Sequence, residues 1–69
     1  MMKNEEEKIR HVVFYLGLRP GNLMLVEMTD GRFRILHNDL NIEGEEWASD
    51  AFEEALARYN EWKVKLLPG

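Results

Sequence analysis

The first third of the chain carries apolar residues at helical spacing. Within residues 5–16 they recur three or four positions apart, at Ile9, Val12, Val13 and Leu16. This spacing places them on one face of an amphipathic helix. We therefore predict an N-terminal helix over about residues 5–16.

The ends of this segment carry helix signals, but its residues also fit a strand. Asn4 and Glu7 have the spacing of a capping box at a helix start, and Gly17 suits a helix end. The alternative is a third strand, because apolar residues also alternate with smaller or polar ones. The alternating positions are Val12, Phe14, Leu16 and Leu18.

An Asp-Gly pair between two apolar runs predicts a β-hairpin. Asp30-Gly31 is typical of a type I′ turn, whose two central residues need positive φ. The strands then span about residues 23–28 and 33–37. A two-residue loop places Met28 opposite Phe33 and Met24 opposite His37.

This register makes both sides of the hairpin apolar. One side carries Met24, Val26, Met28, Phe33, Ile35 and His37, and the other carries Leu23, Leu25 and Leu36 beside a Glu27–Arg34 pair. A two-stranded ribbon in water is not normally apolar on both sides. We therefore expect helices on both sides or contact with another molecule. The candidate interaction residues are Met24, Val26, Met28, Phe33 and Ile35.

The last third of the chain predicts a second amphipathic helix, over about residues 48–63. Ser49 is placed to cap its start. An apolar stripe follows at Phe52, Ala55, Leu56, Tyr59 and Trp62, and we expect Trp47, Phe52, Tyr59 and Trp62 to anchor the core. The prediction is one small α+β domain over residues 1–69, with the hairpin packed by the C-terminal helix.

The polar connection between hairpin and helix resembles a calcium-binding loop. Counted from Asp39, an EF-hand loop places oxygen ligands at Asp39, Asn41, Glu43 and Asp50, with Gly44 at the turn position. Three features differ: Asp50 is shorter than the usual Glu, an acid replaces the apolar position 8, and a strand precedes the loop. A strand-to-helix turn with solvated acids explains the same residues, so a divalent-cation site stays an alternative.

Charge and composition exclude several classes of protein. The chain holds 13 acidic and 9 basic residues, a net charge of −4, and its arginines are scattered among acids. Nucleic-acid binding needs a basic stripe, so it is not expected. Cysteine is absent, which excludes disulfides and thiolate metal sites. No apolar run reaches the roughly 20 residues of a membrane helix, and the acidic start differs from a signal peptide. We expect a cytoplasmic protein.

Candidate catalytic groups are few. His11 lies on the predicted first helix, His37 ends the second strand, and the hydroxyls of Ser49 and Thr29 have structural positions. No spacing links these residues into a nucleophile and base, and no glycine-rich phosphate loop occurs. We expect a protein that is not an enzyme and needs no cofactor.

Residues 23–59 resemble the HicB-type antitoxin domain. The matching residues are Asp30, Gly31 and Phe33 at the turn, Asp39 and Leu40 in the connection, and Glu53, Glu54, Ala55 and Leu56 in the helix. The prolines that the family has around its Asp-Leu pair are replaced by Asn38 and Asn41. The connection is about two residues longer, a candidate helix precedes the hairpin, and no DNA-binding segment follows.

The resemblance implies an inhibitor that neutralises a small basic RNA-cleaving toxin. Opposite net charges would favour that encounter, and the implied contact residues are Asp39, Glu43, Glu45 and Glu46. From the apolar hairpin and small size, our first hypothesis is a non-catalytic interaction module that forms a homodimer. The inhibitor of a basic protein and the divalent-cation binder are the alternatives.

Overall fold

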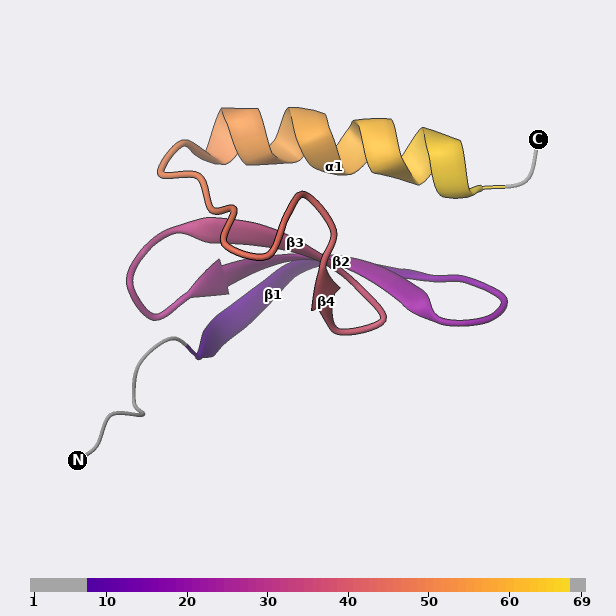
Figure 1. Cartoon of the computed structure of the whole chain (residues 1–69), viewed down its shortest axis with the longest axis horizontal. Helices are drawn as coiled ribbons and strands as arrows, with labels where there is room; N and C mark the ends of the chain where they lie inside the picture. The colour runs from indigo at the N-terminus through magenta and orange to yellow at the C-terminus, as the bar shows by residue number, and fades with distance from the viewer. Residues whose placement is uncertain (1–7, 68–69) are drawn as a thin grey trace.

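The computed structural model describes residues 8–67, and these form a four-stranded antiparallel sheet with one helix (Figure 1). The strands follow chain order across the sheet: β1 Ile9–Gly17, β2 Asn22–Met28, β3 Phe33–His37 and β4 Leu40–Asn41. α1 Phe52–Leu66 lies over one face (Figure 1). The predicted α+β class, with a hairpin and a C-terminal helix, is confirmed. Within residues 8–67, no helix has the length and apolar content that a membrane crossing requires.

The predicted N-terminal helix is wrong over its described residues, which form β1, the alternative named above. The centre of β1, from Val12 to Tyr15, is β-branched and aromatic, and such residues favour strands. β1 also pairs with β2, whose backbone groups would otherwise lack partners on that side. Pairing between strands therefore overrides the helical spacing. Asn4 and Glu7, the predicted capping box, lie outside the described residues.

Two irregularities in β1 explain why its apolar spacing looked helical. The register with β2 shifts between Ile9 and His11 and again between Val12 and Phe14. A bulge puts an extra residue into one strand and breaks strict alternation. Val13, the extra residue at the second shift, packs against the core under α1. An apolar pair at adjacent positions thus arises from a bulge instead of a helix.

The β2–β3 loop has three residues, not the predicted two. The Met28 N–H donates to the Arg32 carbonyl at 2.8 Å, and the Gly31 N–H donates to the Met28 carbonyl at 2.9 Å. Of the loop residues, only Gly31 has positive φ, at 88°. This is the pattern of a type I turn with a glycine bulge. Phe33 therefore faces Glu27 and not Met28.

A register change of one residue exchanges the faces of the predicted hairpin. Leu23 and Leu25 share a face with Ile35 and Phe33, so the predicted grouping of Met24, Val26 and Met28 with these two β3 residues is wrong. The predicted Glu27–Arg34 pair is also wrong. Arg34 lies opposite Val26, and the side chains of Val26 and Glu27 are on different faces of the sheet.

The two-residue turn with two positive φ angles occurs one connection later. Asn38 has φ 55° and Asp39 has φ 70°, and they join β3 to β4. Asn and Asp are the non-glycine residues that best tolerate this conformation. The Asn38 side-chain oxygen also accepts from the Asn22 N–H at 3.0 Å, which ties this turn to the start of β2.

The core lies between α1 and one face of the sheet. Leu23, Leu25 and Ile35 are fully buried there against Ala55 and Tyr59. Phe14 of β1 stacks on the Tyr59 ring, with 5.8 Å between ring centroids. Of the predicted anchors, Tyr59 is buried, Trp47 and Trp62 pack half-buried against the core, and Phe52 lies outside it with an edge contact to Phe33.

α1 begins at Phe52, later than predicted, and Ser49 is not its N-cap. The cap position is Ala51, which makes no side-chain capping bond. The Ser49 backbone instead pairs with Phe33 of β3 through two hydrogen bonds of 2.8 and 3.0 Å. The chain is therefore fastened to the sheet before the helix starts.

Candidate interaction surface

The sheet face opposite α1 is apolar and carries no helix among residues 8–67 (Figure 1). Opposed residues of antiparallel strands share a face, so the strand pairing assigns its members. We call this the open face. Its residues are Ile9, Val12 and Tyr15 of β1, Met24, Val26 and Met28 of β2, and Arg34 and Leu36 of β3.

Exposure differs strongly between the middle and the edge of the open face. Val26, opposite both Val12 and Arg34, is fully buried, and Met28 is nearly so. The edge strand β1 supplies the exposed apolar area: Tyr15 is 63% exposed and Val12 is 44% exposed. A partner would therefore contact mainly β1 and the outer parts of the neighbouring strands.

The structure splits the five apolar residues that the sequence predicted as one interaction surface. Met24, Val26 and Met28 are on the open face, whereas Phe33 and Ile35 face α1. Ile35 is fully buried in the core and offers no contact area.

Sequence reasoning missed the exposed contributors, Ile9, Val12 and Tyr15, because the helix prediction removed this segment from the sheet. The alternation noted around Val12 indicated a strand, but it did not identify these residues, because the bulge after Val12 puts Phe14 and Leu16 on the helix-covered face.

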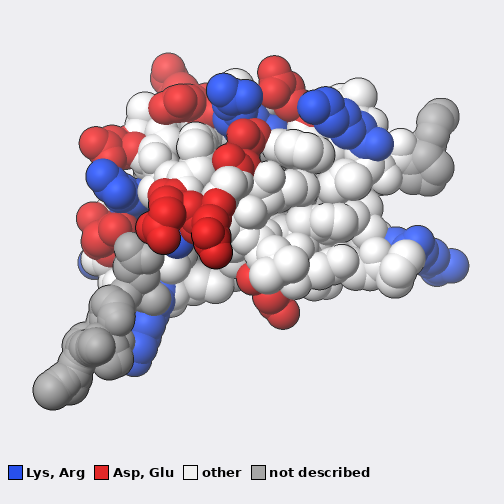
Figure 2. Space-filling model, viewed as in Figure 1, with Lys and Arg blue, Asp and Glu red and all other residues white. Residues whose placement is uncertain are grey.

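Acidic side chains gather at one end of the molecule. Figure 2 shows many of them around the connection and the start of α1, with Lys and Arg side chains interspersed there, whereas the far end of the molecule, at the end of α1 and the β1–β2 loop, carries mainly Lys and Arg. The exposed acids at the first end are Glu45, Glu46, Asp50, Glu53 and Glu54. The acid-rich end is separate from the apolar open face.

The four acids implied by the antitoxin resemblance occupy different environments. Asp39 is exposed on the β3–β4 turn, and Glu45 and Glu46 are exposed in the connection. Glu43 is not available in the same way: its side chain is 14% exposed and accepts a 2.6 Å hydrogen bond from the Trp62 indole N–H. Glu43 fastens the connection to α1.

The candidate calcium ligands do not converge. Asn41 donates from its amide to the Trp47 carbonyl at 2.8 Å, Glu43 bonds Trp62, and Asp50 lies 3.3 Å from Arg32. Within the described residues, no three Asp, Glu, His or Cys side chains are grouped to hold a metal ion. The calcium-loop spacing in the sequence therefore has another explanation. Asn41 holds a turn of the connection, Glu43 binds α1, and Asp50 pairs with Arg32.

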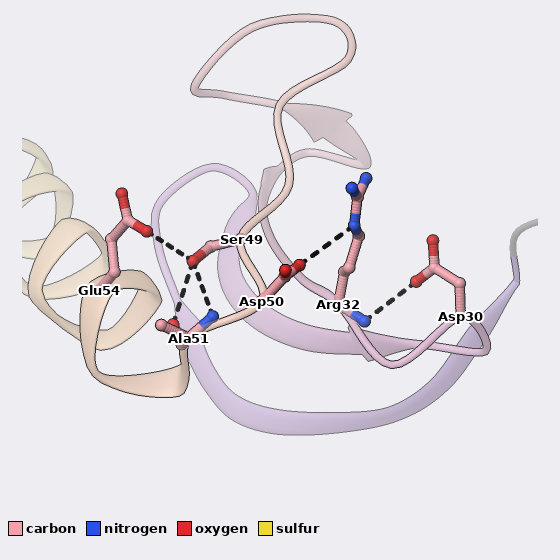
Figure 3. A network of polar contacts seen from close by, with 6 residues as sticks. All are labelled: Asp30, Arg32, Ser49, Asp50, Ala51 and Glu54. Carbon is pink, nitrogen blue, oxygen red and sulfur yellow. Dashed lines mark hydrogen bonds and ion pairs between the residues drawn. The ribbon is translucent and has the colours of Figure 1, made fainter.

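Figure 3 shows how the chain is held where the connection enters α1. Ser49 Oγ accepts from the Ala51 N–H at 3.1 Å and lies 2.7 Å from a Glu54 carboxylate oxygen, to which it donates. Asp50 reaches back to Arg32 of the β2–β3 loop. Asp30 accepts from the Arg32 N–H at 3.0 Å. These contacts hold the chain between the β2–β3 loop and the first turn of α1.

The histidines lie on the helix-covered side of the sheet at different positions. His11 Nδ1 is 3.4 Å from Glu27, which also lies 3.8 Å from Arg10. His37 ends β3 opposite Leu23 and is half-buried. Neither histidine contacts the Ser49 hydroxyl, whose partners are Ala51 and Glu54.

Comparison of the chain with protein-family models, curated proteins and solved structures finds no match. The surface described above is therefore interpreted from its own residues.

Proposed function

We propose that this chain is a non-catalytic interaction module that forms a homodimer through the open face. The observation that carries the proposal is the apolar sheet surface opposite α1, with Tyr15 and Val12 exposed on its edge strand. Contiguous exposed apolar patches mark contact sites more often than isolated apolar residues do.

A second copy of the chain is the partner that fits this face. A two-fold dimer brings the same patch of both copies together, and packed sheets are a common arrangement for such faces. The five exposed acids of the acid-rich end lie near the start of α1, so two open faces can meet without bringing these acids together. A single core of this size also supplies only about 3–5 kcal/mol of stability, which makes shared burial valuable.

The exposed area predicts a weak dimer. At about 25 cal/mol per Å² and roughly 200 Å² for a whole aromatic side chain, the exposed part of Tyr15 is worth about 3 kcal/mol. Ile9 and Val12, each 44% exposed, add roughly 1 kcal/mol apiece. Two copies therefore gain about 10 kcal/mol, against an association cost of about 4–15 kcal/mol. We expect a dissociation constant between tens of micromolar and about 1 mM, which corresponds to an association cost of about 4–6 kcal/mol.

Sedimentation equilibrium from micromolar to millimolar protein tests the proposal. Tyr15→Asp should shift the chain to monomer, because it puts a charge into the contact. Val64→Asp is the matched control, since Val64 is 73% exposed on α1, away from the open face. Circular dichroism verifies that both variants fold. A wild type that stays monomeric at millimolar concentration contradicts the proposal, as does an equal effect of the two variants.

The acid-rich end supports a second candidate, the inhibitor of a small basic protein implied by the HicB-type resemblance. Glu45, Glu46 and Asp50 are exposed in the connection and just before α1, where Figure 2 shows acidic side chains gathered. Such a surface steers a basic partner, and the attraction weakens as salt rises. Asp39, which the resemblance also implies, lies on the β3–β4 turn, at the other end of β3 from the Phe33–Ser49 pair, and is not part of this group.

Co-purification with a small basic protein tests this candidate. The complex should form at low salt, dissociate at high salt, and weaken when Glu45 and Glu46 are both replaced by Lys. Tyr15→Asp, which targets the open face, should leave it intact. Binding that changes neither with salt nor with the double substitution contradicts the inhibitor hypothesis. That result would not bear on the homodimer proposal.

A further inference from the structure

A cavity lies at the end of the molecule opposite the acid-rich end. Three segments distant in sequence form it: the end of β1 and the following loop at residues 17–20, the end of β3 with its turn at His37 and Asn38, and the end of α1 at Leu66 and Leu67. Its volume is about 430 Å³. Small-molecule sites in proteins span roughly 300–1,000 Å³, so this cavity is large enough for a small organic ligand.

The wall of the cavity is mainly aliphatic. Leu18 and Pro20 line one side, and Leu66 and Leu67 line the other. Leu18 and Leu66 also pack against the core, which fixes their positions. An apolar wall with a small number of polar groups is the usual composition of a ligand site.

The polar groups on the wall are hydrogen-bond donors whose protein partners are lacking among the described residues; Arg19 and Asn38 are exposed, and His37 is half-buried. Within residues 8–67, the Arg19 guanidinium makes no ion pair and the His37 ring makes no hydrogen bond. By contrast, Arg10, Arg32 and Arg58 each lie beside a carboxylate. The Asn38 amide oxygen accepts from the Asn22 N–H, and its NH₂ group has no acceptor among the described residues. Three donors thus border one cavity in an acidic protein.

Local charge decides which ligand group these donors favour. The carbonyl end of a helix is partly negative and opposes an anion, but the last turn of α1 carries Lys63 and Lys65. Arg19 adds a permanent positive charge on the opposite wall. An anionic group is therefore best placed near Arg19 and His37, with an apolar body directed toward Leu66.

We propose that this cavity binds a small organic carboxylate with an aliphatic body. The carboxylate accepts hydrogen bonds from Arg19, His37 and the Asn38 amide, and its chain lies against the leucines at the end of α1. Arg19 is the residue that distinguishes a carboxylate from a neutral molecule of the same shape, because ionised hydrogen bonds are about twice as strong as neutral ones. The site is independent of the open face.

Titration with octanoate, followed by amide and histidine-ring NMR shifts, tests the proposal. Octanol serves as the neutral probe of the same length. Octanoate should shift the signals of His37, Asn38 and Leu67, and it should bind about tenfold more tightly than octanol. Arg19→Gln should remove that difference. Arg32→Gln, an arginine at the other end that pairs with Asp50, should preserve it.

A second variant separates the cavity from general binding of an amphiphile. Leu67→Trp adds bulk at the cavity wall and should weaken octanoate and octanol alike. Equal affinity of wild type for the two probes overturns the proposal, and so does an unchanged octanoate affinity in Arg19→Gln. Shifts confined to the open face, around Val12 and Tyr15, would show binding to exposed apolar surface and would also overturn it.

Discussion

Replacing Gly21 by Ala should remove a large part of the stability of this domain. Gly21 lies in the β1–β2 loop with φ 97°, a conformation that L residues rarely adopt. A Cβ at this position would overlap the Asn38 side-chain oxygen. That oxygen accepts from the Asn22 N–H at 3.0 Å, so Asn38 cannot move without losing the hydrogen bond between the two turns.

The expected loss has two parts. Holding a non-glycine residue at positive φ costs about 1–2 kcal/mol. Displacing the Asn38 side chain removes a hydrogen bond worth about 0.5–1.5 kcal/mol. The sum, about 1.5–3.5 kcal/mol, is at least about a third of the 3–5 kcal/mol or so that a core of this size supplies.

Urea unfolding followed by tryptophan fluorescence measures this loss. Gly31→Ala is the matched control, because Gly31 also has positive φ, at 88°, yet a Cβ there meets no atom within 4 Å. Gly31→Ala should therefore lose only the 1–2 kcal/mol or so of unfolding free energy that comes from positive φ. Asn38→Ala, made in both backgrounds, closes a double-mutant cycle. In the Asn38→Ala background, Gly21→Ala should cost no more than Gly31→Ala does in the wild type.

Two results would refute this reasoning. Gly21→Ala could prove no more destabilising than Gly31→Ala, which would mean that the contact with Asn38 is relieved without cost. Strict additivity of Gly21→Ala and Asn38→Ala would show that the two residues are not coupled. Either outcome would also weaken the assigned position of Asn38 on the cavity wall.

Three further predictions concern groups in or beside the core. Burial raises the pKa of Tyr59 above 10.0, so its neutral form stabilises the fold below pH 10.0 and this contribution falls as pH rises through the folded pKa. Tyr59→Phe should therefore lose less stability than the wild type as the pH rises above 10.0 in urea titrations. Glu43→Ala removes the 2.6 Å bond from Trp62 and should cost about 1.5–3 kcal/mol in urea unfolding. Ser49→Ala leaves the Ala51 N–H without its acceptor and should lower the unfolding free energy by about 1–2 kcal/mol.

Nearby exposed residues provide the controls. Glu46→Ala changes an exposed acid of the same connection and should leave the unfolding midpoint within error. Asp50→Ala removes a side chain that is 84% exposed, and a surface ion pair contributes little. Equal losses for Glu43→Ala and Glu46→Ala would contradict the role given to Glu43. An identical alkaline loss in wild type and Tyr59→Phe would contradict the role given to Tyr59 burial.

The sequence alone identified the elements whose signals are local. Asp30-Gly31 between two apolar runs predicted the β2–β3 hairpin, because a turn is specified by residues that tolerate its backbone angles. The apolar stripe through Ala55 and Tyr59 predicted α1 and its buried side, because residues at helical spacing share one face of a helix wherever that helix packs.

Candidate site residues were predicted less well, since they depend on strand register. Asp-Gly fits both a two-residue and a three-residue loop, and the hydrogen bond between Met28 and Arg32 selects the longer one. With the three-residue loop, Phe33 and Ile35 face α1 and the core, and they are not part of the predicted interaction surface.

Only the tertiary structure decided the state of residues 9–17. Their apolar spacing fits a helix, but β2 offers a full edge of backbone partners, and two bulges let the segment pair with it. The sequence by itself determined one hairpin, one amphipathic helix and an acidic connection. The pairing of distant strands determined the rest, because it fixes which side of each strand α1 covers and which side remains open.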